Sequence, residues 1–322
     1  MPGLVWAFRI HADGVAEELT PDQPIEDRHD GWLWLHFNLA DARVPPLLRS
    51  LPYLPANAAA MLTAADAHQH LHGDENCVYG VFADMLRDLN GMTHEVGFLR
   101  FAMTERYLVS ARRGALTAVE AARQTLRGGY RVPTAPMLLR TIVEHIVESV
   151  DHFTDELFAE LDAIEETVVG TRLVDERQRL ARLRRTAVRL HRQLAAMRTL
   201  FHRLDRSPSE ATCEALRLDT HLLVQRLDGL DHEIVALRDR AHLLQEEIAA
   251  KLAEETNRNL RILSFVTMLL MPATLVAGIF GMNMEDLPLV RTDGGFAIAI
   301  LLATGASAVA WWLLRRLGVV NR

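Results

Sequence analysis

Apolar and polar positions repeat with different periods along the chain, and these periods predict where strands give way to helices. Residues 1–134 carry short apolar runs of the strand type between helical patches, which predicts an α+β cytoplasmic domain. The expected strands lie at residues 5–11, 32–37 and 78–82, with a hairpin over 98–111 that turns near Thr104 and Glu105. Residues 135–260 lose the strand signals and predict a helical stalk.

The stalk region predicts three helices. They cover residues 138–169 and 175–204, and the third starts at Ser207-Pro208, because a cap residue followed by proline opens a helix. An apolar seam in the third helix has the heptad spacing of a helix packed against others: Leu230, Ile234, Leu237, Ala241, Leu244 and Ile248. A second stripe mixes small and polar residues: Asp239, Leu243, Glu246, Ala250, Ala253 and Asn257. It fits a solvated face and the lining of a wet channel equally well.

Residues 261–322 contain two apolar runs without a charged residue, at about 262–280 and about 296–314, joined by a loop over 281–295. Each run has about nineteen residues, which as a helix spans the roughly 30 Å hydrocarbon core of a bilayer. The second run ends in two tryptophans and then two arginines, the residue types that anchor a helix at the membrane surface. Two transmembrane helices are therefore expected.

The mixed stripe continues from the stalk into the first apolar run. Its members recur in steps of three and four: Asn257, Leu260, Ser264, Thr267, Met271, Thr274, Gly278 and Gly281. Helix interfaces and pores gather small and polar residues on one face, whereas a lipid-facing surface has no reason to do so. Close helix packing alone is the other interpretation. Since two spans cannot enclose a pore, a pore requires an oligomer with this helix innermost.

Composition and charge set the topology. With 24% charged residues and a mean hydropathy of +0.04, the chain is mostly soluble with a small membrane part. The first residues lack the basic start and apolar core of a signal peptide, so the N-terminal portion is expected in the cytoplasm. Basic residues flank the two spans, whereas the loop is mainly acidic, which predicts that both termini are cytoplasmic. The net charge of −7 does not by itself identify a binding partner. The two cysteines, Cys77 and Cys213, are expected to be ordinary thiols.

The loop between the spans carries oxygen ligands. Asn283 offers a neutral amide dipole to a cation, and the carboxylates of Glu285 and Asp286 raise the local cation concentration. Such ligands suit an ion that keeps its water, as Mg²⁺ does. The spans contain no Cys or His, so a transition metal is also expected to pass largely hydrated.

Two histidine groups are weaker candidates for metal sites. His68, His70 and His72 share a face only if the segment is a strand, and they fit a solvated strand edge or a regulatory cation site. His145 and His152 recur at helical spacing among many acids, which favours a wet helix face over the metal site of a membrane-bound enzyme.

The next helix is as basic as the preceding one is acidic, which predicts that adjacent antiparallel helices attract each other. The arginines come with no nucleic-acid recognition motif, so no nucleic-acid partner is expected. No phosphate-binding loop or catalytic triad is present in the sequence, and neither an enzyme activity nor a cofactor is expected.

The segment 271–283, ending in Gly281-Met282-Asn283, follows a long stalk helix and precedes a second span with a basic end. In that setting the chain resembles the CorA family of divalent cation transporters. Residues 32–38 and 106–112 look most like its zinc-transporter branch, ZntB. The resemblance implies a funnel-shaped homopentamer in the bacterial inner membrane, with the first span lining a central pore. It places Gly281, Met282 and Asn283 at the entrance of the hydrated ion, and the following residues along its route: Thr274, Met271, Leu263, Leu260 and Asn257.

Two departures from the family pattern bear on the cargo. Phe280 stands where magnesium-type members usually have tyrosine, and the acidic loop at 284–288 replaces the glycine-rich neutral loop of zinc-type members. The favoured hypothesis is Zn²⁺ transport, with Mg²⁺ or Co²⁺ transport as the alternative. A membrane-anchored scaffold or sensor without a conducting path is the alternative from another class.

Overall fold

The computed structural model describes residues 1–20, 31–65, 68–74, 77–88, 91–168, 173–206, 220–282 and 294–316. By its contacts the chain divides into two units, Met1–Gln245 and Glu246–Arg322. The helix start expected at Ser207-Pro208 lies outside the described residues, as do Asn283, Glu285 and Asp286 of the loop.

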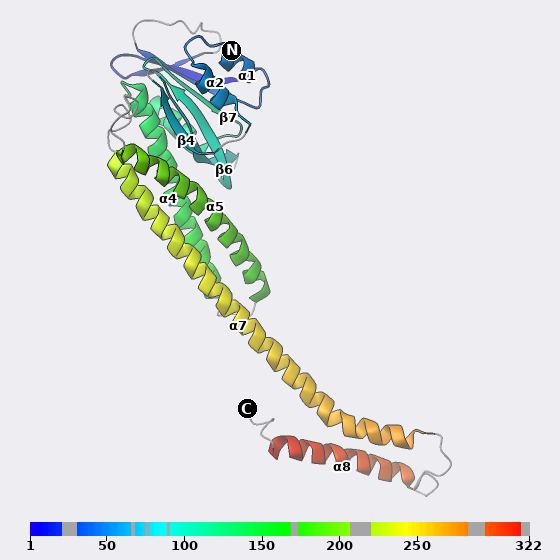
Figure 1. Ribbon diagram of the computed structural model, residues 1–322. Coiled ribbons are helices and arrows are strands. Elements are labelled where there is room, and N and C mark those ends of the chain that lie inside the picture. Colours follow the sequence, from blue (N-terminus) through cyan, green and yellow to red (C-terminus); the bar gives the residue numbers. More distant parts are fainter. Residues whose placement is uncertain are drawn as a thin grey trace. The chain divides into compact units, whose positions relative to one another are not determined.

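The first unit contains one mixed sheet (Figure 1). Its strands are β1 (Leu4–Ile10), β2 (Ala16–Leu19), β3 (Trp32–Asn38), β4 (His70–Asp74), β5 (Cys77–Asp88), β6 (Gly91–Met103) and β7 (Tyr107–Arg112). They pair in the order β2-β1-β3-β7-β6-β5-β4, and only β3 and β7 run parallel to each other. This parallel pair joins two segments that are more than sixty residues apart in the sequence.

The strand predictions are confirmed for the central strands. The hairpin of β6 and β7 turns where expected, with the backbone N–H of Thr104 donating to the carbonyl of Tyr107 at 2.8 Å. Strands β2 and β4 were not predicted, and they are the two edges of the sheet. Their sequences, Ala-Glu-Glu-Leu and His-Leu-His-Gly-Asp, are too polar to give an apolar strand pattern.

Helices cover both faces of the sheet. Helices α1 (Val44–Ser50) and α2 (Ala56–Thr63) close one face, where Leu48 and Leu62 pack in a core with Leu35 and Phe37 of β3. On the other face, Arg123 of α3 (Thr117–Arg127) lies over the ring of Trp6, 4.6 Å from its centroid. Because both faces are covered, β3 is buried along nearly its whole length and shows no in-out alternation.

Three long helices complete the first unit: α4 (Ala135–Val168), α5 (Leu173–Arg206) and the first part of α7 (Thr220–Phe280). The predicted apolar seam of α7 is confirmed, since its six members are at most 5% exposed. Helix α5 also packs on the sheet, where Phe201 stacks on Phe82 of β5 with ring centroids 5.9 Å apart. Helix α7 is continuous over Thr220–Phe280, as expected for a stalk helix that runs into the first apolar run.

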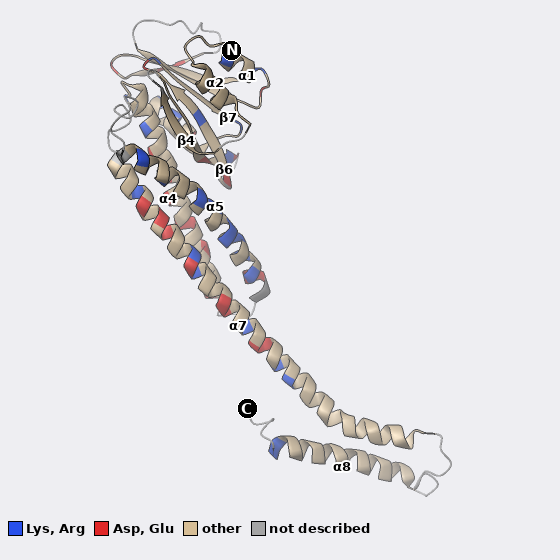
Figure 2. Ribbon diagram, viewed as in Figure 1, with Lys and Arg blue, Asp and Glu red and all other residues tan. Residues whose placement is uncertain are grey.

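Acidic residues gather on α4 and basic residues on α5 (Figure 2). The predicted attraction between these two helices is carried, among the described residues, by one ion pair, Arg179 with Glu160 at 3.9 Å. Among the described residues, the other ion pairs between helices of this bundle run to α7, where Arg240 binds Asp162 at 2.8 Å and also Glu165. Aspartates of α7 in turn pair with α5, as in the ion pair of Arg198 with Asp231. Helix α7 therefore carries charges of both signs that hold α4 and α5 to it.

The second unit pairs the end of α7 with α8 (Gly295–Arg316). Apart from the final Leu314, the less exposed positions of α8 are all small residues: Gly295, Ala299, Ala303, Ala306, Ser307 and Ala310. The Ser307 hydroxyl donates to the carbonyl of Leu269 on α7 at 3.0 Å, which marks this small-residue face as the face toward α7. Small residues let two helices approach closely in a membrane, where no hydrophobic effect drives them together.

Candidate ion path on the first membrane helix

Among the described residues, two helices are long and apolar enough to cross a membrane: the part of α7 over His221–Phe280, and α8 over Gly295–Arg316. Almost none of their most apolar stretches is buried within the chain, since the buried share is 0% for the first and 6% for the second. A core helix of a soluble protein would be covered by its own chain. These surfaces are therefore left for lipid or for other copies of the chain.

The polar stripe of α7 lies opposite the face that meets α8. The half-buried positions of the first span, which pack toward α8, are Phe265, Leu269, Pro272, Ala273, Val276 and Phe280. At 100° per residue, the stripe through Ser264, Thr267, Met271, Thr274 and Gly278 is centred about half a turn away from that face. All five stripe residues are exposed in the single chain. Helix α8 therefore covers the apolar side of α7 and leaves the polar stripe free.

A shallow groove of about 690 Å³ follows this face, and its lining includes Thr267, Met271, Thr274 and Gly278. The two threonine hydroxyls donate to the carbonyls of Leu263 and Leu270 in their own helix, both at 2.9 Å. A hydroxyl oxygen that donates its hydrogen still has two lone pairs, so it can accept a hydrogen bond from an ion's water shell. The stripe thus offers oxygen acceptors without leaving an unpaired donor.

The other positions assigned to the ion route lie along the same exposed surface. Leu260, Leu263 and Met271 are 53%, 63% and 65% exposed, and Asn257 is exposed at the cytoplasmic end expected from the sequence. Leu263 stands at the rim of the stripe rather than on it, one residue from the strict repeat. At the other end, Gly281 and Met282 close α7 through the carbonyls of Ala277 and Ile279, at 2.9 and 3.3 Å.

The three neighbouring histidines lie along the edge of the sheet. His70 and His72 lie in strand β4 and His68 just before it, and their rings form a row, with centroids 4.9 Å apart for His68 and His70 and 5.3 Å apart for His70 and His72. Burial and the two neighbouring imidazoles lower the pKa of His70, against the opposing effect of its hydrogen bond to the His68 carbonyl. Within the described ranges no group of three or more His, Cys, Asp or Glu is arranged to hold a metal ion. Strand β4 is an edge of the sheet, and His68 and His72 are exposed.

The helical histidine face is occupied by local contacts. His145 Nδ1 lies 3.1 Å from Glu148, its Nε2 lies 3.1 Å from the hydroxyl of Thr125, and His152 lies 3.5 Å from Glu156. These contacts tie each histidine to a neighbouring side chain and converge on no common point.

The two segments that resemble the zinc-transporter branch meet across the parallel pair β3 and β7. The hydroxyl oxygen of Ser110 accepts a hydrogen bond from the Trp34 indole N–H at 2.8 Å and lies 2.8 Å from Nδ1 of His36. Arg112 Nε donates to His36 Nε2 at 3.1 Å, so the neutral ring carries its proton on Nδ1 and donates it to Ser110. The Ser110 hydroxyl then donates to the Leu35 carbonyl at 3.4 Å.

This polar network holds His36 neutral. Full burial lowers the pKa of His36 well below its usual value, and the charges of Arg112 and Arg123 lower it further. The network links the parallel strands β3 and β7 inside the core, where His36 and Ser110 are directly paired in the register. It explains why Trp34, His36 and Ser110 occur in these segments without assigning them a role in transport.

A second buried group, Asp84 of β5, holds the start of α3. Its carboxylate accepts backbone hydrogen bonds from Met85 at 2.7 Å and from Ala118 at 3.0 Å. The residue at the N-cap position, Leu116, has no side chain able to cap the helix, so Asp84 supplies the missing acceptor from the sheet. Burial raises the pKa of Asp84 to about 7 despite these hydrogen bonds.

The sequence interpretation missed the small-residue face of α8. Its signal was available, since Gly295, Ala299, Ala303 and Ala310 recur at steps of four and seven. Read in this way, the pattern assigns α8 its partner face and leaves the threonine stripe of α7 outside that contact.

Comparison with known proteins identifies the family. Residues 29–316 match the family described as CorA-like Mg2+ transporter protein. Zinc transport protein ZntB of Enterobacter sp. (strain 638) is 26% identical over 323 residues, covering 98% of this chain and 96% of that protein. Divalent cation transporter CmaX of Pseudomonas aeruginosa is 29% identical over 324 residues, with the same coverage of 98% and 96%.

Two solved structures share the fold over nearly the whole chain. The full-length CmaX structure superposes with a TM-score of 0.77 at 24% identity, covering 98% of both chains. The complete structure of the CorA magnesium transporter from Methanocaldococcus jannaschii gives a TM-score of 0.69 at 18% identity, covering 98% of this chain and 99% of that one. The expected fold class, an α+β N-terminal domain with a long helix and two C-terminal apolar helices, is thereby confirmed. The chain belongs to the CorA-like Mg2+ transporter family, a family of divalent cation transporters.

Proposed function

We propose that five copies of this chain form a central pore in the bacterial inner membrane that conducts a divalent cation, with Zn²⁺ as the favoured cargo. The observation that carries the proposal is the position of the polar stripe of α7 opposite the face that meets α8. Two spans cannot surround a pore, so the stripe lines one only where several α7 helices face a common axis. In this arrangement the loop with Asn283, Glu285 and Asp286 lies at the outer end of the pore, and both chain termini lie in the cytoplasm.

In this proposal the hydrated ion meets Gly281, Met282 and Asn283 first, and Glu285 and Asp286 raise its concentration there. It next passes the oxygens of Thr274 and Thr267, which accept hydrogen bonds from its water. The route continues past Met271, Ser264, Leu263 and Leu260 to Asn257. No soft ligand has to replace the water shell along this route. The membrane potential favours inward movement of a divalent cation by about 4.6 kcal/mol per 100 mV.

The choice of Zn²⁺ rests on the segments 32–38 and 106–112 and on an aligned relative that is a zinc transport protein. Mg²⁺ or Co²⁺ is the alternative cargo, favoured by the acidic loop and by the magnesium named in the family description. Competition between Zn²⁺, Mg²⁺ and Co²⁺ for uptake into vesicles that contain the purified full chain ranks the three ions. Running the assay with and without a pH gradient also detects proton coupling.

The outer site is tested by Asn283→Ala, which should abolish divalent uptake. Undiminished flux through this variant would overturn the assignment of the entrance. A scaffold or sensor without a conducting path would give no uptake in the wild-type chain.

The face of α7 that lines the route is tested by a matched pair of variants. Thr274 and Thr304 are both exposed in the single chain, and both donate to a carbonyl of their own helix, at 2.9 and 2.8 Å. Thr274 lies on the stripe of α7, whereas Thr304 lies on α8. Thr274→Phe should block uptake and Thr304→Phe should not. Equal effects of the two variants would remove the stripe from the route.

A further inference from the structure

Two rows of exposed charged residues run along the helical bundle of the first unit. On α4 the exposed row is Glu148, Asp151 and Asp155, and on α5 the exposed row is Arg192, Arg189 and Arg185. Among the described residues, neither row has an ion pair with another helix. Glu148 has a contact in its own helix, where His145 lies at 3.1 Å. The two rows thus differ from Arg240 and Arg198, which bind carboxylates across the bundle.

The two rows also match in spacing. The acids follow each other at steps of three and four residues, and the arginines do so in the opposite order along the chain. Helices α4 and α5 are consecutive and antiparallel (Figure 1), and the ion pair of Glu160 with Arg179 sets their register. Residues of α4 and α5 whose numbers add to about 340 therefore lie at the same level along the bundle. Glu148 is level with Arg192, Asp151 with Arg189 and Asp155 with Arg185.

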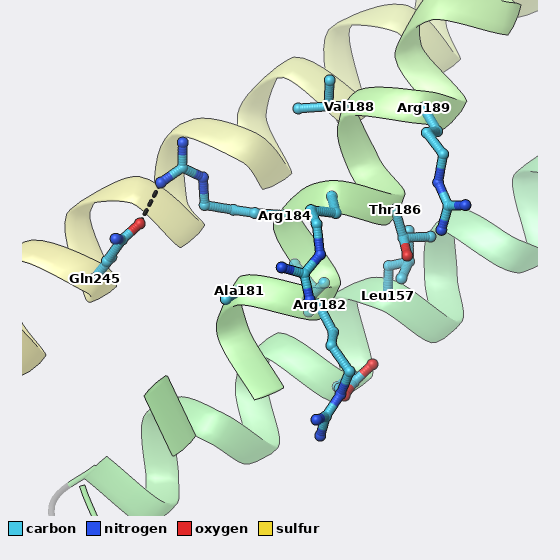
Figure 3. Close-up of a pocket in the computed structure, with 11 residues that line it drawn as sticks. Leu157, Ala181, Arg182, Arg184, Thr186, Val188, Arg189 and Gln245 are labelled. Atoms are coloured by element: carbon cyan, nitrogen blue, oxygen red, sulfur yellow. Dashed lines mark hydrogen bonds between the residues drawn. The ribbon is translucent and has the colours of Figure 1, made fainter. Parts of the chain in front are cut away.

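The arginine side is also hollowed. A groove of about 950 Å³ is lined by residues of α4, α5 and α7, including Arg182, Arg184, Arg185 and Arg189. Figure 3 shows Arg184 reaching Gln245 of α7, to which it is hydrogen-bonded, whereas Arg182 and Arg189 extend in other directions. Arg185 and Arg189 are exposed, and neither has an ion pair with another described residue.

We propose that the acidic row of α4 docks against the arginine row of α5 in the next copy of this chain. A ring of identical copies requires a heterologous interface, in which two different surfaces of each copy meet. Rotation about an axis that runs along the helices keeps every residue at its level, so the three level pairs face each other between copies without a shift. This inference rests on the oligomer of the proposed function but assigns the surfaces through which its cytoplasmic parts touch.

Cross-linking of the full-length protein tests the interface. Asp151→Cys and Arg189→Cys are introduced into two separately tagged chains that lack Cys77 and Cys213, and the chains are produced together. A short bismaleimide should join the two tags, since only contact between copies links one chain to the other. The matched control replaces Arg189→Cys by Thr199→Cys, which is also exposed on α5 but lies about 15 Å further along the helix. Linkage of the tags no stronger than in this control overturns the proposal.

Charge reversal gives a second readout. Arg185→Glu with Arg189→Glu should lower the temperature at which the detergent-solubilised oligomer dissociates at low salt. Adding Asp151→Arg with Asp155→Arg to the same chain should restore it, because opposite charges again face each other. Absence of restoration contradicts the pairing. Uptake is measured on the same preparations. A cross-linked oligomer that transports nothing refutes the proposed function but not the interface. A transporting oligomer without the cross-link refutes the interface but not the proposed function.

Discussion

The two units of the chain differ in which side chains they bury and which they expose. In the first unit most of the large apolar residues are buried, and the buried polar side chains of His36, Ser110 and Asp84 have hydrogen-bond partners. In the second unit large apolar residues are exposed on both helices, and the hydroxyls of Thr267 and Thr274 bond only to their own helix. The first unit therefore has an apolar core of its own, whereas the apolar surface of the second unit is left for lipid or for other copies of the chain.

A pair of phenylalanine truncations tests this contrast most directly. Phe82 is 2% exposed and stacks on Phe101 and Phe201, with ring centroids 5.1 and 5.9 Å apart, whereas Phe296 of α8 is 81% exposed. Phe82→Ala should lower the free energy of unfolding of the first unit by about 3–5 kcal/mol, because it leaves a cavity beneath α5. Phe296→Ala should leave it unchanged. Melting of the full chain in detergent, with hydrogen exchange of the β5 amides, measures both. Equal losses would contradict the division into two differently solvated units.

Asp84 makes the first unit sensitive to pH. Its pKa of about 7 in the folded chain exceeds the value of 3.8 expected when unfolded, so between these pH values the folded chain binds a proton that the unfolded chain releases. Its contribution to stability is full below about pH 3.8 and is lost as the pH rises through about 7. Asp84→Asn should remove this dependence, so that the stability of the wild type relative to the variant falls by up to a few kcal/mol from pH 4 to pH 7.

The titration of His36 changes stability with pH in the opposite direction from that of Asp84, so His36 serves as an internal reference. Its lowered pKa means that the unfolded chain takes up the proton first, so stability falls as the pH drops below about 6.5. The acid sensitivity caused by His36 should therefore remain in Asp84→Asn. Glu105→Gln, at an exposed turn position, is the control for loss of a carboxylate. A stability difference that does not change with pH would show that Asp84 is ionised throughout this range.

The polar network of the core should give a smaller effect. Ser110→Ala removes the acceptor shared by the Trp34 indole and the His36 ring, both buried, and leaves two donors without a partner. The expected loss in unfolding free energy is about 1–3 kcal/mol. Ser149→Ala is the matched control, since that hydroxyl donates only to the carbonyl of Ile146 in its own helix. A loss as small as that of the control would mean that the network rearranges around the missing hydroxyl.

The sequence could predict features that depend on residues close together in the chain, but not contacts between distant segments. Periodicity predicted the two apolar helices, the seam of α7 and the hairpin of β6 and β7, because each depends on residues close together in the chain. It could not place His36 beside Ser110, since the parallel pairing of β3 and β7 brings together residues 74 apart. It could not assign Asp84 to the start of α3 for the same reason. The charged helices had the expected signs, but their partners depend on packing around α7.

The candidate ion path was likewise predictable from the sequence only in part. The stripe of Thr267, Met271 and Thr274 follows from helical spacing alone. That this stripe faces away from α8 depends on which face of α8 packs against α7, and the contact of Ser307 with the Leu269 carbonyl supplies that information. When it is not known which way a helix faces, a stripe of small and polar residues fits close helix packing as well as it fits an ion path. Once α8 occupies the opposite face, an oligomer becomes the natural partner of the stripe.

The smallest expected effect concerns the ion pairs that hold α7 to α4. Arg240 binds Asp162 at 2.8 Å and also Glu165, and all three side chains are at least one third exposed. Exposed pairs contribute little because water screens them, so Arg240→Gln should cost at most about 1 kcal/mol of stability, and less at high salt. Arg238→Gln removes the same charge from the same helix, but Arg238 contacts only its neighbour Asp239, at 3.3 Å. Subtracting its effect leaves the part that comes from the contact with α4. If that part does not shrink between low and high salt, the contact acts through packing of the arginine stem instead of charge.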